Sequence, residues 1–325
     1  MSSIIFLQFF LGIVLIGLGA NLLVSYTGRL SANLNISHFI SSFIFIGLAT
    51  SSPEIFITIL STIKSASNIA IGNALGSNIS NIAFVFALSL LFVKINKDDI
   101  KNTVNHETII FFKYLVFYII LLIPILWDSK IDFYESMVLL MSLLLFVIWY
   151  KKSLKKRERK DVWTNKDNIY YLLFLLTLSL SVLLAGTELF LMGARGFASY
   201  IGISNYVLGL SITAIGSSLP ELAASMESIR KKNVDFVIGN ILGSNIFNIA
   251  IVMGLIGLIE TLLNTSSLEL LTRKDVIRDI IMISTTTLAL VIVAKNYNSY
   301  FVKSMGIILL TSFIIYQMNL YGFSI

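Results

Sequence analysis

The sequence predicts an all-α integral membrane protein with ten transmembrane helices in two inverted-topology repeats of five helices. Three observations predict this fold class: a composition too apolar for a soluble domain, ten apolar segments of membrane-spanning length, and a long motif that occurs twice. Of the 325 residues, 56% are hydrophobic and 13% are charged, whereas soluble domains carry roughly 25% charged residues. This composition excludes a soluble enzyme, a disordered chain and a disulfide-stapled scaffold.

Ten segments have the roughly 20 mostly apolar residues that a bilayer crossing requires. They are residues 4–26, 38–63, 68–93, 108–127, 133–150, 169–194, 205–229, 234–262, 277–294 and 301–320. The first of them lacks a preceding basic region, so we interpret it as a retained span and not as a cleaved signal peptide.

The longest polar stretch, 151–168, indicates the orientation. It is rich in lysine and arginine, and short loops with an excess of these residues stay in the cytoplasm. With ten spans both termini then lie outside, and most of the other basic residues also fall inside. The net charge of +6 therefore follows the membrane and does not indicate a nucleic-acid partner, although the loop could also bind anionic lipid or a regulator. We expect a multi-pass protein of the plasma or inner membrane with no obligatory protein partner.

An internal repeat divides the chain into two halves. A shift of 167 residues aligns IGNALGSNISNIA (71–83) with IGNILGSNIFNIA (238–250), which are identical at 11 of 13 positions. Five spans, an odd number, separate the copies, so equivalent helices cross the membrane in opposite directions. Inverted repeats of this kind are typical of secondary transporters, whose substrate site lies near the midplane. The predicted units are a first five-helix repeat over 1–150 with its repeated core near 44–84, a basic cytoplasmic loop over 151–168, and a second five-helix repeat over 169–325 with its core near 211–251.

Polar residues lie inside these apolar helices at equivalent positions of the two halves. They form four pairs, each within one helix. The two members of a pair are four residues apart and therefore share a helix face. The pairs are Thr50 with Glu54, Ser77 with Asn81, Ser217 with Glu221, and Ser244 with Asn248. A carboxylate at the centre of a membrane helix costs on the order of 3 kcal/mol, and no span-central lysine or arginine is available to pair with either glutamate. We therefore predict that cations visit the two glutamates, whereas the serines and asparagines alone are equally compatible with helix packing.

Pro53 and Pro220 directly precede the two glutamates. Proline in a helix removes a hydrogen bond and opens the turn, which predicts free carbonyls around Ala49-Thr50 and Gly216-Ser217. Two bidentate carboxylates and two carbonyls offer the oxygen ligands that calcium prefers, and without nearby histidine or cysteine zinc and copper are poor candidates. Neutral oxygens suited to sodium come from the hydroxyls of Ser51, Ser77, Ser218 and Ser244.

These motifs resemble those of a known family. GLATSSPE (47–54) with GNALGSN (72–78), and AIGSSLPE (214–221) with GNILGSN (239–245), are similar to the two α-repeats of the calcium/cation antiporter superfamily, in particular its sodium/calcium exchangers of the prokaryotic type without a regulatory domain. The resemblance extends over the whole ten-span chain. It implies that calcium and sodium are the transported ions and that no cofactor takes part.

The resemblance also implies roles for individual residues. A calcium site is expected from Glu54 and Glu221 with main-chain oxygens of Thr50 and Ser217. Flanking sodium sites are expected from Ser51, Ser77, Ser218 and Ser244 with carbonyls near Gly47 and Ala214, and Asn81 and Asn248 are expected in the middle of the cluster. Some relatives carry aspartate at the position of Asn248, so this chain offers one carboxylate fewer.

We therefore expect a secondary active antiporter, not an enzyme, that exchanges sodium for calcium by alternating access. The two glutamates can neutralise calcium or sodium ions but not both, and the first and sixth spans are expected to slide. A proton/calcium antiporter is the nearest alternative, because the same carboxylates can take protons. A cation channel is less expected because it needs no mirror-related gates, and an intramembrane enzyme lacks candidate catalytic groups.

Overall fold

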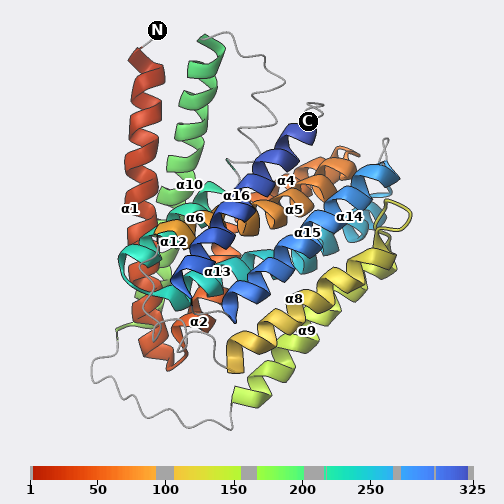
Figure 1. Cartoon of the computed structure of the whole chain (residues 1–325), viewed down its shortest axis with the longest axis horizontal. Coiled ribbons are helices and arrows are strands. Elements are labelled where there is room, and N and C mark those ends of the chain that lie inside the picture. The colour runs from red at the N-terminus through yellow and green to blue at the C-terminus, as the bar shows by residue number, and fades with distance from the viewer. Residues whose placement is uncertain are drawn as a thin grey trace.

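The computed structural model describes residues 3–92, 106–154, 167–200, 216, 218–265, 272–295 and 298–320. Within these ranges all regular secondary structure is helical (Figure 1). Eight helical segments are long and apolar enough to cross a membrane: Ile4–Leu34, Ser67–Phe92, Thr108–Ile125, Phe133–Tyr150, Ile169–Ala194, Val234–Leu263, Arg273–Ala294 and Ser299–Leu320. The prediction of an all-α membrane protein is thereby confirmed.

Two further predicted spans are broken or only partly described. The segments His38–Thr50 and Ser52–Ile63 pass the same test together but are bent by 40° at the break between them. Residues 205–215 and 217 of the predicted span 205–229 fall outside the described residues, and the rest of the span lies mainly in α12 (Leu219–Arg230). The number of ten spans therefore stays a prediction. Most of the basic loop 151–168 also lies outside the described residues.

The helix bounds recur in the two halves with the offset of the sequence repeat. α4 (Ser52–Ile63) and α5 (Ser67–Ser80) correspond to α12 and to α13 (Val234–Phe247) at an offset of 167 residues. Two π-helical segments, η2 (Asn81–Phe86) and η3 (Asn248–Val252), begin at equivalent asparagines. The other elements are α1 (Ser3–Leu34), α2 (His38–Ser41), η1 (Ser42–Gly47), α3 (Leu48–Thr50), α6 (Ala87–Phe92), α8 (His106–Ile125), α9 (Phe133–Leu154), α10 (Ile169–Tyr200), η4 (Met253–Leu255), α14 (Ile256–Leu263), α15 (Arg273–Ala294) and α16 (Ser299–Leu320).

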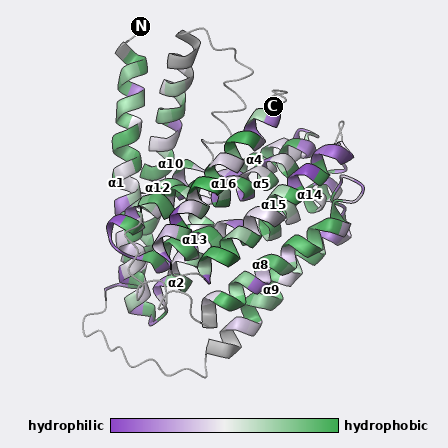
Figure 2. Ribbon diagram, viewed as in Figure 1, coloured by the Kyte–Doolittle hydropathy of each residue, from purple (hydrophilic) through white to green (hydrophobic). Residues whose placement is uncertain are grey.

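The outer helices present apolar side chains to their surroundings. Figure 2 shows hydrophobic residues along the outer faces of α1, α8 and α9. Only 17% of the most apolar stretch of α1 is buried inside the bundle, and only 22% of that of α9. Exposed apolar surface on this scale is not found on soluble monomers, so these faces contact lipid.

α1 and α10 pack side by side at one edge of the molecule and run in opposite directions (Figure 1). Their backbones approach closely at glycines. A Cβ atom added at Gly19 would lie 2.6 Å from the Leu183 backbone nitrogen, which leaves no room for any larger residue. Small residues at a helix interface let backbones meet in this way, and here they join α1 and α10 into one tightly packed pair.

α5 and α13 lie at the centre of the bundle. Every residue of α13 from Phe236 to Phe247 is buried, and 72% of the most apolar stretch of α5 and α6 is buried. The GNALGSN and GNILGSN motifs of the sequence repeat therefore lie in largely enclosed helices.

Candidate functional site

The break before Glu54 is built from local sequence. The helix of η1 and α3 ends at Ser51, whose φ and ψ are −79° and 3°, and α4 restarts with Pro53 in its first turn. Proline is tolerated there because the first-turn amide has no intrahelical acceptor. Ser52 Oγ donates to the Ala49 carbonyl at 2.6 Å, which occupies one of the two lone pairs of this oxygen. The expectation of open carbonyls around Ala49-Thr50 stays a prediction, since the second lone pair of the Ala49 carbonyl can still face a cation.

The second half repeats the arrangement. Ser218 has φ and ψ of −91° and 4°, Pro220 lies in the first turn of α12, and Glu221 follows it. Of the other residues predicted here, Ser217 and Ala214 lie outside the described residues. Their predicted roles remain predictions.

The two glutamates are fully buried, each with 0% of its surface exposed. Ser77 Oγ donates to Glu54 Oε1 at 3.1 Å. Glu221 interacts electrostatically with Glu54 and lies beside the hydroxyls of Thr50 and Ser244. In the described part of the chain, Glu54 Oε2 and both Glu221 oxygens accept no hydrogen bond, and neither carboxylate forms an ion pair. Burying a charge without a partner costs several kcal/mol, so both carboxylates require a cation or a proton.

Contacts between the two halves enclose the carboxylates. Thr50 Oγ1 lies 3.2 Å from Ser244 Oγ, and Ser244 Oγ donates to the Gly47 carbonyl at 3.3 Å. Gly243 permits this approach, since a Cβ atom there would lie 2.6 Å from the Phe43 carbonyl oxygen. Gly47, Thr50 and Ser244, predicted from two distant motifs, are therefore in direct contact.

Four more predicted residues present buried polar atoms without partners. Ser51 and Ser218 are fully buried, and their hydroxyls make no hydrogen bond to any described residue. The same is true of both amide atoms of Asn81 and of Asn248. Each asparagine is the first residue of a π-helical segment, and π-bulges within α-helices are frequent at functional sites.

Asn240 is a site residue that sequence reasoning missed. Its Nδ2 donates to the Glu221 carbonyl at 3.1 Å and to Ser225 Oγ at 3.0 Å. Its Oδ1 lies 3.3 Å from Thr50 Oγ1, which donates to it. Asn240 thus connects the second-half carboxylate helix to the first-half hydroxyl. The signal was available, because Asn240 lies four residues before Ser244 on the same helix face and repeats Asn73.

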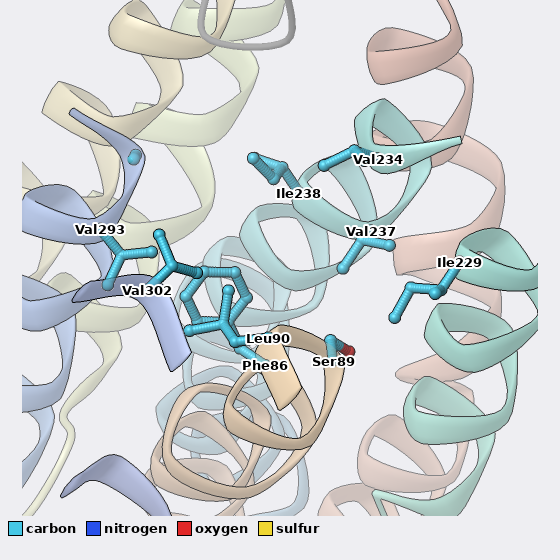
Figure 3. A pocket seen from close by; sticks show the side chains of 10 residues that line it. Phe86, Ser89, Leu90, Ile229, Val234, Val237, Ile238, Val293 and Val302 are labelled. Atoms are coloured by element: carbon cyan, nitrogen blue, oxygen red, sulfur yellow. The ribbon is translucent and has the colours of Figure 1, made fainter. Parts of the chain in front are cut away.

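The set of unpaired atoms suits a hard cation. Buried polar groups are almost always hydrogen-bonded to protein or to ordered water, and an orphaned cluster of carboxylate, hydroxyl and amide atoms is a donor set that a hard cation satisfies. Oxygen donors are the ligands of calcium and sodium. The described residues contain no cluster of three or more His, Cys, Asp or Glu. A separate pocket is lined by apolar residues such as Phe86, Leu90, Ile229, Val237 and Val302 (Figure 3); because it contains neither glutamate, it is not the cation site.

A polytopic helical bundle with two enclosed carboxylates and a shell of neutral oxygens defines a membrane transporter for cations. The family model described as sodium/calcium exchanger protein matches residues 4–151 and 171–322. The chain belongs to the sodium/calcium exchanger family, and is therefore an antiporter and not an enzyme, as the two repeated motifs predicted.

Individual relatives agree with this assignment. The putative antiporter CaxA of Alkalimonas amylolytica is 32% identical over 96% of this chain and 97% of its own. The sodium/calcium exchanger MaX1 of Methanosarcina acetivorans is 25% identical over 79% of this chain and 84% of its own. The solved sodium/calcium exchanger from Methanococcus jannaschii superposes with a TM-score of 0.75 at 26% identity, covering 97% of this chain and 98% of that one.

Proposed function

We propose that the protein exchanges sodium for calcium across the plasma membrane by alternating access at one midplane site. This proposal rests on two fully buried glutamates, of whose four carboxylate oxygens three accept no hydrogen bond from the described residues. Two negative charges balance one calcium ion or a set of sodium ions, but not both at once. Each ion must therefore leave before the other enters, which is the basis of obligatory exchange.

Individual residues have distinct roles in this proposal. Calcium binds Glu54 and Glu221 with the main-chain oxygens of Thr50 and Ser217. Sodium occupies flanking positions formed by Ser51, Ser77, Ser218 and Ser244 with the carbonyls of Gly47 and Ala214. Asn81 and Asn248 complete the middle of the cluster and supply neutral amide oxygens. The contact of Thr50 with Ser244 and of Ser77 with Glu54 supports a single shared site.

The same proposal includes ten transmembrane helices in two inverted five-helix repeats, 1–150 and 169–325, with the loop 151–168 in the cytoplasm and both termini outside. The equal offset of α4 and α5 from α12 and α13 supports the repeat. The opposite directions of α1 and α10 support the inversion (Figure 1). Because α1 and α10 are tightly packed together, they move as one unit against the remaining helices when the site changes its exposure.

The coupling ion is tested with the purified protein in proteoliposomes. Vesicles are loaded with sodium, potassium or acidic buffer, and uptake of radioactive calcium from a sodium-free medium is followed. We expect rapid uptake only into sodium-loaded vesicles, and none with the Glu54→Gln, Glu221→Gln double variant. Equal uptake driven by a proton gradient without sodium would establish a proton/calcium antiporter, and calcium flux with measurable conductance and no counter-ion would establish a channel.

A further inference from the structure

A groove between α8 and α15 is distinct from the cation site. It lies at the end of the bundle where α8 begins and α15 ends (Figure 1), and its volume is about 220 Å³. Two of its lining residues are the lysines Lys113 and Lys295. The others are all apolar: Ile109, Phe112 and Val116 from α8, and Val291 and Ala294 from α15.

The spacing of these residues places each lysine on an apolar helix face. On α8, Lys113 is four residues after Ile109 and three before Val116, so the three side chains share one face. Lys295 directly follows the last residue of α15 with its backbone still in the helical region, so it is four residues after Val291 in the same way. Ile109 is 39% exposed and Val116 is 38% exposed, so the groove opens outward to the lipid and not into the protein core.

The two lysines have no counter-charge among the residues that the structure describes. Neither forms an ion pair with any described acidic residue, and no acidic residue lines the groove. Elsewhere, Arg29 pairs with Asp167 at 2.8 Å and Arg278 with Asp275 at 2.7 Å. A charged side chain within a membrane helix is costly unless it reaches the interface or a partner, and a lysine stem can lie along apolar surface while its ammonium extends to the headgroup level.

We propose that this groove binds an anionic glycerophospholipid. Its phosphate lies between the ammonium groups of Lys113 and Lys295, and one acyl chain lies along the apolar lining. Basic pockets between membrane helices bind anionic headgroups in this manner. A zwitterionic lipid fits less well because its own cation would face the second lysine, and a free anion would leave the apolar lining empty. The bound lipid joins α8 to α15 and leaves the cation site untouched.

Native mass spectrometry of the purified full-length protein tests this proposal. The protein in detergent is titrated with phosphatidylglycerol or phosphatidylcholine of identical acyl chains. We expect one phosphatidylglycerol to be retained at least tenfold more tightly than phosphatidylcholine. The Lys113→Gln, Lys295→Gln double variant should lose this preference, because each lysine near the membrane surface contributes to anionic-lipid binding. Equal retention of both lipids by the parent protein, or an unchanged preference in the double variant, would overturn the proposal.

Three controls separate the groove from general effects. Lys303→Gln removes a positive charge from an exposed residue at the same end of the bundle, outside the groove, and should keep the preference. The Lys113→Arg, Lys295→Arg variant restores both charges and should also keep it, which excludes misfolding as the cause of a loss. Inorganic phosphate should not compete with the lipid; competition at equal concentration would mean that the lysines bind an anion without an acyl chain.

Discussion

Replacing Asn240 with alanine tests how the site is held in position. The change removes the amide that donates to the Glu221 carbonyl and to Ser225 Oγ and that accepts from Thr50 Oγ1, at 3.1, 3.0 and 3.3 Å. A net contribution of about 1 kcal/mol per hydrogen bond gives a loss of about 3 kcal/mol in stability. Because Thr50 and Glu221 both lose a positioning contact, we also expect the KM for calcium to rise by about tenfold, which corresponds to 1.4 kcal/mol.

The chain provides a matched control at the equivalent position of the first half. Asn73 is the repeat partner of Asn240, but its Nδ2 has no hydrogen-bond partner among the described residues. Asn73→Ala should therefore cost less than about 1 kcal/mol and leave the calcium KM nearly unchanged. Thermal unfolding in detergent measures the first quantity, and sodium-dependent calcium uptake into proteoliposomes measures the second. Equal effects of the two substitutions would refute the bridging role of Asn240.

Three other predictions concern topology, selectivity and movement. A single cysteine at Lys130, an exposed position, should react with an impermeant thiol reagent in intact cells while one at Asn165 should not; the reverse pattern would contradict the proposed orientation. Asn248→Asp adds a third carboxylate to the site, so exchange should become more dependent on pH, and an unchanged pH profile would mean that residue 248 does not face the ions. Lys231 donates to the α1 backbone at 2.9 Å and so ties α12 to the α1–α10 pair; Lys231→Gln should raise turnover several-fold by weakening this charge-assisted contact, whereas Lys232→Gln, at an exposed position, should not.

Much of the site was predictable because the unfavourable free energy of placing its carboxylates in membrane helices can be inferred from the sequence. Two glutamates lie in apolar spans, each after a proline and each in a repeated motif. Burying them is too unfavourable to be explained by helix packing alone. The structure places Glu54 and Glu221 in full burial and brings Thr50 against Ser244. The repeat itself predicted the matching bounds of the helices on either side of each motif.

Other features depend on contacts that sequence spacing does not determine. The hydrogen bond from Ser52 Oγ to the Ala49 carbonyl follows from one side-chain rotamer, which the sequence does not determine. The bridge from Asn240 to Thr50 joins residues 190 positions apart, and its twin Asn73 has an unpaired Nδ2 despite the same motif. The link from Lys231 to α1 likewise exists only once the helices are packed.

Calcium binding by the two glutamate variants tests the central claim most directly. Isothermal titration of the purified protein should show calcium binding that sodium competes away. Glu54→Gln and Glu221→Gln should each abolish it while the protein remains folded, because each glutamate supplies half of the counter-charge and its neutral amide is easier to bury. Calcium affinity within about twofold of the parent protein in either variant would show that these carboxylates do not hold the transported ion.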